Sequence, residues 1–260
     1  MKDVALITGA SSGIGRELAR VHAETGGSII AVATNQKRLD ALKQELEAAH
    51  GISVMVIVKD LTQPGASREV FEAVKEAGIE IDSLINNAGF GGRGKFHERK
   101  WEEDLAMIRL NILALTELTH LFLPGFVARN KGRILNTSST ASLVPGPLQS
   151  VYFATKAYVS SFSNALSGEL LGTKVTVTNL MPGATESRFA QVAGMDKTGL
   201  FAKPATARSV AQDGYDAMMR GDMDVMSGVS FARRLMLRIA PLLPKKMILS
   251  QVMDAQKDIA

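Results

Sequence analysis

Three polar side chains have a spacing that could support proton transfer. Tyr152 and Lys156 are four residues apart, and Ser139 precedes Tyr152 by thirteen positions. On a helix, residues i and i+4 share one face, so the phenol and the ammonium group would project side by side. A cation about 4 Å from a tyrosinate contributes roughly 4 kcal/mol at an effective dielectric constant of about 20, enough to lower the tyrosine pKa from about 10 to about 7 before desolvation opposes it. The pair predicts a tyrosine that exchanges protons near neutral pH, although the same spacing also occurs on helices without catalytic function.

The length allows one large α/β domain or two small ones, and the hydrophobic content allows a large core. The chain has 260 residues, 46% of them hydrophobic, and no cysteine, which excludes disulfides, thiolate catalysis and cysteine-bound metal. The formal net charge of +4 is modest and no basic run alternates with aromatic residues, so we expect no nucleic-acid partner. The four histidines are scattered, and we assign no metal site. With neither a cleavable leader nor an uncharged apolar stretch of about 18 residues, we expect a cytoplasmic protein without a spanning helix.

Strand-length apolar runs alternate with helix-length amphipathic segments along most of the chain. This alternation predicts an α/β fold with a doubly wound, mostly parallel sheet (Rossmann-like) covered by helices on both faces, in a single domain of residues 1–260. The expected strands are residues 4–7, 29–33, 54–58, 83–86, 133–137 and 175–180, with a short one at 224–226. The expected helices are residues 13–25, 36–49, 65–77, 101–128, 150–171 and 205–220.

The pattern becomes less regular after Pro182. Residues 184–205 contain few periodic apolar residues, so we expect a substrate loop there. Residues 228–260 mix basic and apolar residues, and Pro241 and Pro244 should divide this helical tail into two short helices. The composition of the tail permits a cover over the active site, an oligomer contact or a peripheral membrane contact, and the prolines disfavour one long membrane helix.

The first expected strand leads into a glycine-rich turn, Thr8-Gly-Ala-Ser-Ser-Gly-Ile-Gly15. Gly9 permits a tight turn, Gly13 lets backbone amides approach a pyrophosphate, and Gly15 allows close contact between helix and sheet. The helix N-terminus then faces the anion, and the two serines add hydroxyl donors. The turn therefore predicts a phosphate-binding site.

Two further strand ends are compatible with a bound dinucleotide. Asp60 and Leu61 follow the third expected strand, where the carboxylate could accept a hydrogen bond from an adenine amino group. Asn87, Ala88 and Gly89 follow the fourth, beside the crevice where ligands bind in such sheets. An ordinary cap or turn would explain each of these residues without a ligand.

Taken together, these motifs resemble the classical short-chain dehydrogenase/reductase (SDR) family over residues 3–187. The motifs follow the family's order and spacing: the glycine turn, the Asn86–Gly89 motif, Asn111, Ser139, Tyr152, Lys156 and the Pro182-Gly183 pair. The resemblance implies an oxidoreductase that transfers a hydride between NADP(H) and a carbonyl or secondary alcohol substrate. It also implies a homodimer or homotetramer.

The resemblance further implies a catalytic tetrad of Asn111, Ser139, Tyr152 and Lys156. Tyr152 would protonate the carbonyl oxygen or, in reverse, deprotonate the alcohol, and Lys156 would lower the tyrosine pKa and bind the nicotinamide ribose. Ser139 would orient the carbonyl, and its spacing to Tyr152 selects it over Ser138. Asn111 would kink its helix and hold a water that relays protons to Lys156.

The resemblance places cofactor contacts along the whole nucleotide. They are Gly9, Ser11, Ser12, Gly13, Ile14, Gly15, Thr34, Asn35, Arg38, Asp60, Leu61, Asn87, Ala88, Gly89, Tyr152, Lys156, Pro182, Gly183 and Thr185. Ser187 either joins them or is an ordinary loop serine.

The end of the second expected strand bears on the choice between NADP and NAD. An acidic residue there would bind the ribose 2′-hydroxyl and repel a 2′-phosphate, and none is present. The segment holds Thr34, Asn35, Lys37 and Arg38 instead, so we favour NADP, with use of NAD still open. The sequence departs from many NADP-dependent relatives, which carry arginine at Thr34 or a basic residue at Ser11, so the preference depends on Lys37 or Arg38.

The expected substrate wall is mostly apolar, which favours a hydrophobic ketone or aldehyde. It comprises Phe90, Arg93, Phe96, Leu143, Val144, Pro145, Leu148 and Phe189. Arg93 would either pair with an acidic substrate or be solvated. Two alternatives stay open: a non-catalytic nucleotide-sensing or scaffolding protein on the same fold, and a nucleotide-sugar epimerase or dehydratase, for which the chain leaves little room after residue 183.

Overall fold

The computed structural model describes residues 1–187, 189–195, 198–201 and 204–257, and these contain a seven-stranded sheet in the order β3-β2-β1-β4-β5-β6-β7. Each pair of neighbouring strands is parallel. The strands are β1 (Ala5–Thr8), β2 (Ile29–Ala33), β3 (Val54–Val58), β4 (Ser83–Asn86), β5 (Gly132–Thr137), β6 (Val175–Pro182) and β7 (Asp224–Ser227). The strand order changes direction between β1 and β4, which opens a crevice at the carboxyl ends of these two strands.

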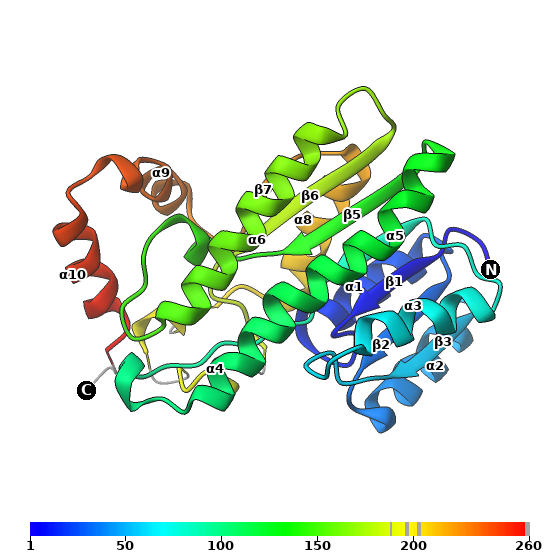
Figure 1. The fold of residues 1–260 in the computed structure, drawn as a ribbon, viewed down its shortest axis with the longest axis horizontal. Helices are drawn as coiled ribbons and strands as arrows, with labels where there is room; N and C mark the ends of the chain where they lie inside the picture. Colours follow the sequence, from blue (N-terminus) through cyan, green and yellow to red (C-terminus); the bar gives the residue numbers. More distant parts are fainter. Residues whose placement is uncertain (188, 196–197, 202–203, 258–260) are drawn as a thin grey trace.

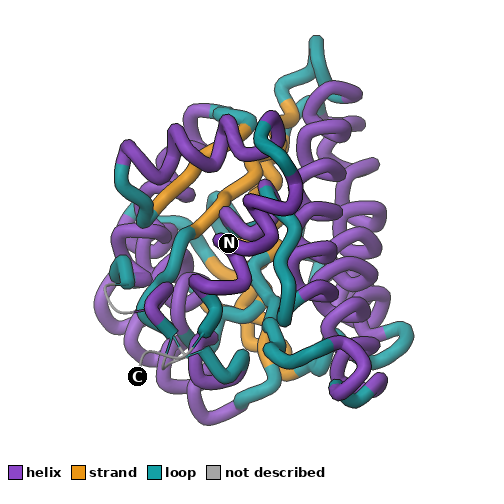
Figure 2. The backbone as a smooth tube through the Cα atoms, turned by 90° about the vertical axis from the view of Figure 1, so that its left-hand side faces the viewer, coloured by secondary structure: helices purple, strands orange, loops and turns teal. Residues whose placement is uncertain are grey.

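Helices cover both faces of the sheet (Figures 1 and 2). One layer consists of α1 (Gly13–Glu24), α2 (Gln36–His50) and α8 (Ala207–Arg220), and the other of α3 (Ala66–Glu76), α5 (Leu115–Arg129) and α6 (Ser150–Glu169). Successive residues of a strand point to opposite faces, so Ile7 packs with Leu18 in one core and Leu6 packs with Phe126 in the other. The predicted doubly wound α/β fold is confirmed.

A row of polar side chains crosses the sheet at one level, buried on three strands and exposed at Asp224 on the edge strand β7. The strand register places Asn86 beside Asn136, Asn136 beside Asn179, and Asn179 beside Asp224. Asn86 Nδ2 donates to Asn136 Oδ1 at 3.0 Å, and Asn179 Nδ2 donates to Asp224 Oδ1 at 2.7 Å. A slip of one residue would turn these amides toward the opposite face of the sheet, so the row specifies the register of four strands.

The same row holds α6 against the sheet. Asn136 Nδ2 donates to Ser163 Oγ at 2.9 Å, and Asn179 Nδ2 donates to Ser160 Oγ at 3.1 Å. Because α6 also carries Tyr152 and Lys156, these contacts set the height of both side chains above the carboxyl ends of the strands.

The segment expected as one helix over 101–128 is interrupted. It consists of α4 (Trp101–Ile108), a π-helical segment η2 (Arg109–Ala114) that includes Asn111, and α5. By length and composition, Trp101–Arg129 could cross a membrane, and the sequence criterion missed it because Arg109 and Glu117 interrupt the apolar run. This is weak evidence for a membrane span, since a buried core helix meets the same test, and α5 places Phe122 and Phe126 in the core beside the sheet.

Short elements occupy the remaining connections. They are η1 (Phe96–Glu98), η3 (Thr140–Leu143), α7 (Phe189–Val192) and η4 (Gly199–Phe201). The expected substrate loop, 184–205, therefore contains two of them, while residues 188, 196–197 and 202–203 of that loop lie outside the described residues.

The tail divides where its prolines predict. It forms α9 (Phe231–Ile239), η5 (Ala240–Leu242) and α10 (Lys245–Ala255), and residues 258–260 lie outside the described part. Figure 1 shows α9 and α10 together at one end of the molecule, apart from the two helical layers.

The polar row leads to a stability prediction. Asn136→Ala should lower the free energy of unfolding by about 2–4 kcal/mol, because it leaves buried groups of Asn86 and Ser163 without this partner and opens a small void. Gln36→Ala is the matched control, since its amide donates an exposed 2.7 Å hydrogen bond to Asp40 away from the row and its loss should cost under about 1 kcal/mol. Urea unfolding measures both values, and equal losses would contradict the special role of the row.

Candidate active site

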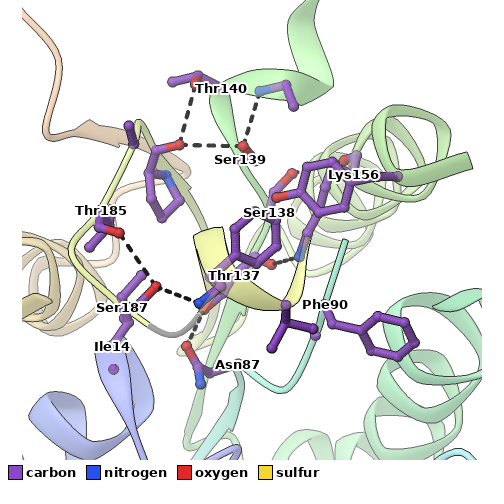
Figure 3. A pocket seen from close by; sticks show the side chains of 18 of the residues that line it. Ile14, Asn87, Phe90, Thr137, Ser138, Ser139, Thr140, Lys156, Thr185 and Ser187 are labelled. Atoms are coloured by element: carbon purple, nitrogen blue, oxygen red, sulfur yellow. Dashed lines mark hydrogen bonds between the residues drawn. The ribbon is translucent and has the colours of Figure 1, made fainter. Parts of the chain in front are cut away.

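A cavity of about 580 Å³ opens at the carboxyl ends of the strands. The turns after β1 to β4 form one end, the β5–α6 region forms the centre, and the segment after β6 together with the tail forms the other end. Figure 3 shows side chains from the first three of these regions converging on the central part. All the expected cofactor contacts except Gly15 line this cavity.

The glycine turn lines one end of the cavity with backbone. Gly9 and Gly13 adopt positive φ angles of 70° and 54°, which glycine tolerates best. The N-cap residue Ser12 makes no side-chain cap hydrogen bond, and the first amides of a helix have no intrahelical partner. A pyrophosphate group fits these amides and the positive end of the α1 dipole.

Gly15 lies behind this surface. A Cβ atom there would come within 2.5 Å of the Gly9 carbonyl oxygen and 2.4 Å of Asn87 Nδ2. The residue allows α1 to approach the sheet closely, as the sequence predicts, and it does not line the cavity itself.

A hydroxyl group ties the ends of β1 and β4 together at the crevice. Thr8 Oγ1 accepts hydrogen bonds from the backbone amides of Asn87 and Ala88, both at 2.9 Å. Asn87 Nδ2 returns a hydrogen bond to the Thr8 carbonyl at 3.0 Å. The Asn87–Gly89 backbone is thereby held at the rim of the cavity, with Gly89 against Lys156 and Asn111.

The expected adenosine contacts lie at the end of the cavity near β2 and β3. Thr34, Asn35 and Arg38 line it, and Asn35 caps α2 by accepting a hydrogen bond from the Arg38 amide at 3.0 Å. Lys37 does not line the cavity, so of the two basic residues considered from the sequence only Arg38 faces it.

Sequence reasoning missed Lys59, which lines the cavity at the end of β3 and pairs with Glu69. Its place directly before Asp60 is the signal that could have identified it. The Asp60 carboxylate is engaged by Thr62 and Gln63, and these hydrogen bonds outweigh burial, so that the pKa of Asp60 falls below its ordinary value.

Tyr152 and Lys156 lie side by side on α6, as their spacing predicts. Both are almost completely buried, and the Lys156 ammonium lies 5.9 Å from the centre of the Tyr152 ring. Lys156 Nζ donates to the Thr137 carbonyl oxygen at 2.8 Å. Tyr152 also packs against Phe189, with ring centres 5.2 Å apart.

The expectation of a near-neutral tyrosine pKa is wrong for this structure. Burial raises the pKa of Tyr152 to about 12, although a hydrogen bond with Ser139 acts in the opposite direction. Burial also lowers the pKa of Lys156 to about 8. Desolvation disfavours the charged form of each group and outweighs their mutual attraction, which the sequence argument had treated as the larger effect. At neutral pH, Tyr152 therefore carries its proton and is a donor.

The two adjacent serines have different environments. Ser138 is buried, and its Oγ donates to the Lys156 carbonyl at 2.8 Å and contacts Ser160 Oγ at 2.8 Å. Ser139 lines the cavity, accepts a hydrogen bond from the Ala141 amide at 3.1 Å and lies near enough to Tyr152 to lower its pKa against the effect of burial. Figure 3 shows the hydroxyls of Ser139 and Thr140 directed at the Pro182 carbonyl. The structure thus brings Ser139, rather than Ser138, together with Tyr152.

Asn111 lies behind the cavity wall. Its Nδ2 donates to the Phe90 carbonyl and to Thr155 Oγ1, both at 3.0 Å, and its Oδ1 accepts from the Phe90 amide at 3.2 Å. These bonds hold the loop after β4 against α6. A local kink is expected at Asn111, and the structure places this residue in the π-helical segment η2, whereas the proton-relaying water stays a prediction.

The segment after β6 closes over the glycine turn. Pro182, Gly183, Thr185 and Ser187 all line the cavity, and a Cβ atom on Gly13 would lie 3.1 Å from Ser187 Cβ. Thr185 Oγ1 donates to the Gly183 carbonyl at 3.0 Å, and Figure 3 shows Ser187 between Thr185 and Ile14. This proximity places Ser187 with the expected phosphate contacts.

The substrate wall differs from the expected one. Phe90, Val144 and Phe189 line the cavity, whereas the other five expected residues do not. Of these, Phe96 is exposed on η1, and Arg93 donates to the Gly194 carbonyl at 3.2 Å. Sequence reasoning missed Gln149, Phe153, Val192, Met195, Phe201 and, from the tail, Arg233, Met236, Leu237, Ala240, Ile248, Gln251, Val252 and Ala255. A cover over the active site is one of the roles that the composition of the tail permits, and the structure brings the tail to the cavity. The individual tail residues could not be assigned, because their helices reach the cavity through tertiary packing alone.

Metal-ligating side chains do not gather in the described ranges: no group of three or more histidine, aspartate or glutamate residues there could hold an ion. The ionisable residues that line the cavity are Arg38, Lys59, Asp60, Tyr152, Lys156 and Arg233. The acid–base capacity beside the apolar half therefore comes mainly from the Tyr152–Lys156 pair.

Comparisons with known proteins agree with this site. Residues 3–197 match the family model for short chain dehydrogenases. The chain is 39% identical to the NADP-dependent 3-hydroxy acid dehydrogenase YdfG of Salmonella typhi, over 69% of this chain and 71% of that protein.

Two solved structures extend the likeness over nearly the whole chain. A short-chain dehydrogenase from Sphingobium yanoikuyae in complex with NADPH is 31% identical, with a TM-score of 0.83 over 92% of this chain and 93% of that one. The bulky-bulky ketone specific alcohol dehydrogenase from Comamonas testosteroni is 28% identical, with a TM-score of 0.79 over 92% of each chain. The chain belongs to the short-chain dehydrogenase/reductase family and is an NAD(P)-dependent oxidoreductase of alcohol or carbonyl substrates.

Proposed function

We propose that the protein uses NADP(H) to reduce a hydrophobic ketone or aldehyde, with Asn111, Ser139, Tyr152 and Lys156 as its catalytic group. The observation that carries the proposal is the buried, protonated Tyr152 phenol, which lines the same cavity as Ser139, Lys156, the glycine turn and the apolar residues. A protonated phenol in that position is the proton donor that carbonyl reduction requires.

Each polar residue has a distinct task in this mechanism. When bound, the nicotinamide supplies or accepts the hydride. Tyr152 donates its proton to the carbonyl oxygen, while Ser139 hydrogen-bonds the same oxygen and stabilises its developing negative charge. The Lys156 ammonium stabilises the resulting tyrosinate through the field of a nearby cation. Asn111 holds the loop that follows β4 against α6 through its hydrogen bonds to Phe90 and Thr155. We also assign to Asn111 the proton-relaying water expected from the resemblance.

The nucleotide end favours NADP over NAD. Arg38 and Lys59 bring two cations to the cavity, and the α2 N-terminus capped by Asn35 adds its positive dipole end. Asp60 also lines this end, but its carboxylate is engaged by Thr62 and Gln63. The similar proteins named above as NADP-dependent or in complex with NADPH support the same choice.

The apolar end favours a substrate with a bulky hydrocarbon part. Phe153, Phe189 and Met195 line the cavity together with the tail residues Met236 and Leu237. Methionine side chains adapt their shape to different apolar surfaces, so this wall suits carbonyl compounds of varied outline. The likeness to a ketone-specific alcohol dehydrogenase supports a ketone as the reacting group.

The assigned proton donor can be tested with a matched pair of tyrosines on α6. Tyr152→Phe should lower kcat for carbonyl reduction by about 100-fold or more, while the Kd of NADPH stays within about two-fold. Tyr158→Phe removes an exposed hydroxyl that contacts Thr116 and should leave kcat unchanged. A carbonyl panel assayed by NADPH absorbance, with fluorescence titration for binding, gives both readouts. Undiminished turnover by Tyr152→Phe would exclude it as the acid.

The buried lysine predicts a pH dependence. Burial lowers the pKa of Lys156 to about 8, so the ammonium charge is present at neutral pH and is lost as the pH rises through that value. The kcat/KM for NADPH, which reports groups of the free enzyme, should therefore fall above about pH 8. Stopped assays from pH 6 to 10, with circular dichroism to verify folding, measure the profile. A flat profile to pH 10 would contradict the assignment of Lys156.

Cofactor preference can be tested at Arg38. Wild-type protein should bind NADPH more tightly than NADH, and Arg38→Gln should weaken NADPH binding about ten-fold while changing NADH binding by less than about two-fold. Lys37→Gln is the control, because this neighbour does not line the cavity. Calorimetric titration of each variant with both nucleotides provides the constants. Ten-fold tighter binding of NADH by the wild type would overturn the preference for NADP.

A further inference from the structure

The tail carries the whole net charge of the chain. Residues 228–260 contain six of the 30 basic residues and two of the 26 acidic residues, so 24 of each remain elsewhere and cancel. The excess of four positive charges is thus concentrated in the two helices that Figure 1 shows at one end of the molecule. Such an asymmetry favours an anionic partner.

Large apolar side chains are exposed beside these cations. Phe231 and Leu242 have exposed fractions of 82% and 85%. Phe231, Leu235 and Ile239 recur at four-residue intervals and form an exposed stripe along α9. Met236, Met247, Leu249 and Met253 are exposed as well. An apolar surface of this kind marks an interaction site more often than an isolated exposed residue does.

Three cations of the tail are available to a partner. Arg238, Lys245 and Lys246 are exposed and form no ion pair with the residues that the structure describes. The other basic residues differ: Arg234 donates to the Met226 carbonyl at 2.8 Å, Lys257 pairs with Asp254, and Arg233 lines the cavity. Arg238, Lys245 and Lys246 therefore provide uncompensated positive charge on the outer side.

The inner side of the tail has another role. Leu237 and Ile248 are buried and line the cavity, which fixes α9 and α10 on the protein through their inner faces. The helices are therefore held in place while their apolar and basic outer faces stay uncovered. We call this outer face, formed by Phe231, Leu235, Arg238, Leu242, Lys245 and Lys246, the tail face.

We propose that the tail face docks on an anionic lipid bilayer, with its apolar side chains in the interfacial region and its cations against the phosphate headgroups. Amphipathic helices with basic and apolar residues bind membrane surfaces through both contributions. A second copy of this chain fits less well as the occupant, because a two-fold contact would place the same positive surfaces against each other. If the proposed reductase function holds, docking also places the apolar end of the cavity beside the bilayer.

The test is co-flotation of the full-length protein with vesicles of two compositions. Wild-type protein should float with vesicles of phosphatidylcholine and phosphatidylglycerol in equal parts, bind far less to phosphatidylcholine alone, and dissociate as salt is raised. Lys245→Gln/Lys246→Gln should weaken binding to the anionic vesicles about 25-fold, since each basic residue contributes about five-fold. Phe231→Ser/Leu242→Ser should weaken it at least about ten-fold.

The controls separate docking from other effects. Lys75→Gln/Lys174→Gln removes two exposed lysines elsewhere, on α3 and before β6, and should change binding by less than about two-fold. NADPH binding and circular dichroism verify that every variant is folded, and neither readout requires turnover, so failure of the proposed function would leave this test intact. Wild-type protein that does not float with anionic vesicles at low salt overturns the proposal.

Two other outcomes would also overturn the proposal. One is retained binding in both tail-face variants. The other is sedimentation of the wild type as an oligomer that Phe231→Ser/Leu242→Ser converts to a monomer, with no vesicle binding, which would assign the tail face to a second copy.

Discussion

The buried amide row across β4, β5 and β6, which Asp224 extends to β7, is the constraint on which the site depends. Asn86, Asn136 and Asn179 are almost inaccessible to solvent, so their polar groups must find partners inside the protein. Asn86 donates to Asn136 and Thr119, Asn136 donates to Ser163, and Asn179 donates to Ser160 and Asp224, while Oδ1 of Asn86 has no partner among the described residues. Parallel strands gain little specificity from apolar side chains that are similar at every position, and the amides supply it.

That register determines the chemistry at the carboxyl ends of the strands. Thr137 follows Asn136 directly, and its carbonyl accepts the Lys156 ammonium, while Ser138 holds the helix backbone at Lys156. Ser139 comes next, and it lines the cavity while its hydroxyl accepts a hydrogen bond from the Ala141 amide. The three residues that follow Asn136 thus connect the amide row to the cavity wall.

Burial of the tyrosine and lysine has two opposite consequences. It raises the pKa of the phenol, which stays protonated, and it lowers the pKa of the ammonium, which loses its proton more easily. The charged form of each group is therefore less stable than it would be in water. The same low-polarity surroundings strengthen any charge interaction that develops during a reaction. A site with a protonated donor and a nearby cation therefore favours transfer of the phenolic proton to an oxygen atom that is acquiring negative charge.

The sequence by itself determined the α/β alternation, the glycine turn and the order of the polar motifs, because strand and helix periodicity and the steric freedom of glycine are local properties. The resemblance to the family, through the spacing to Tyr152, also favoured Ser139 over Ser138. Other features required the tertiary structure: the position of Lys59, the replacement of most of the expected substrate wall by tail residues, and the sign of the Tyr152 pKa shift. Desolvation depends on every atom around a group, so the residues next to Tyr152 in the chain cannot predict it. The loop after β4 and the tail line one cavity only because distant segments of the chain pack together.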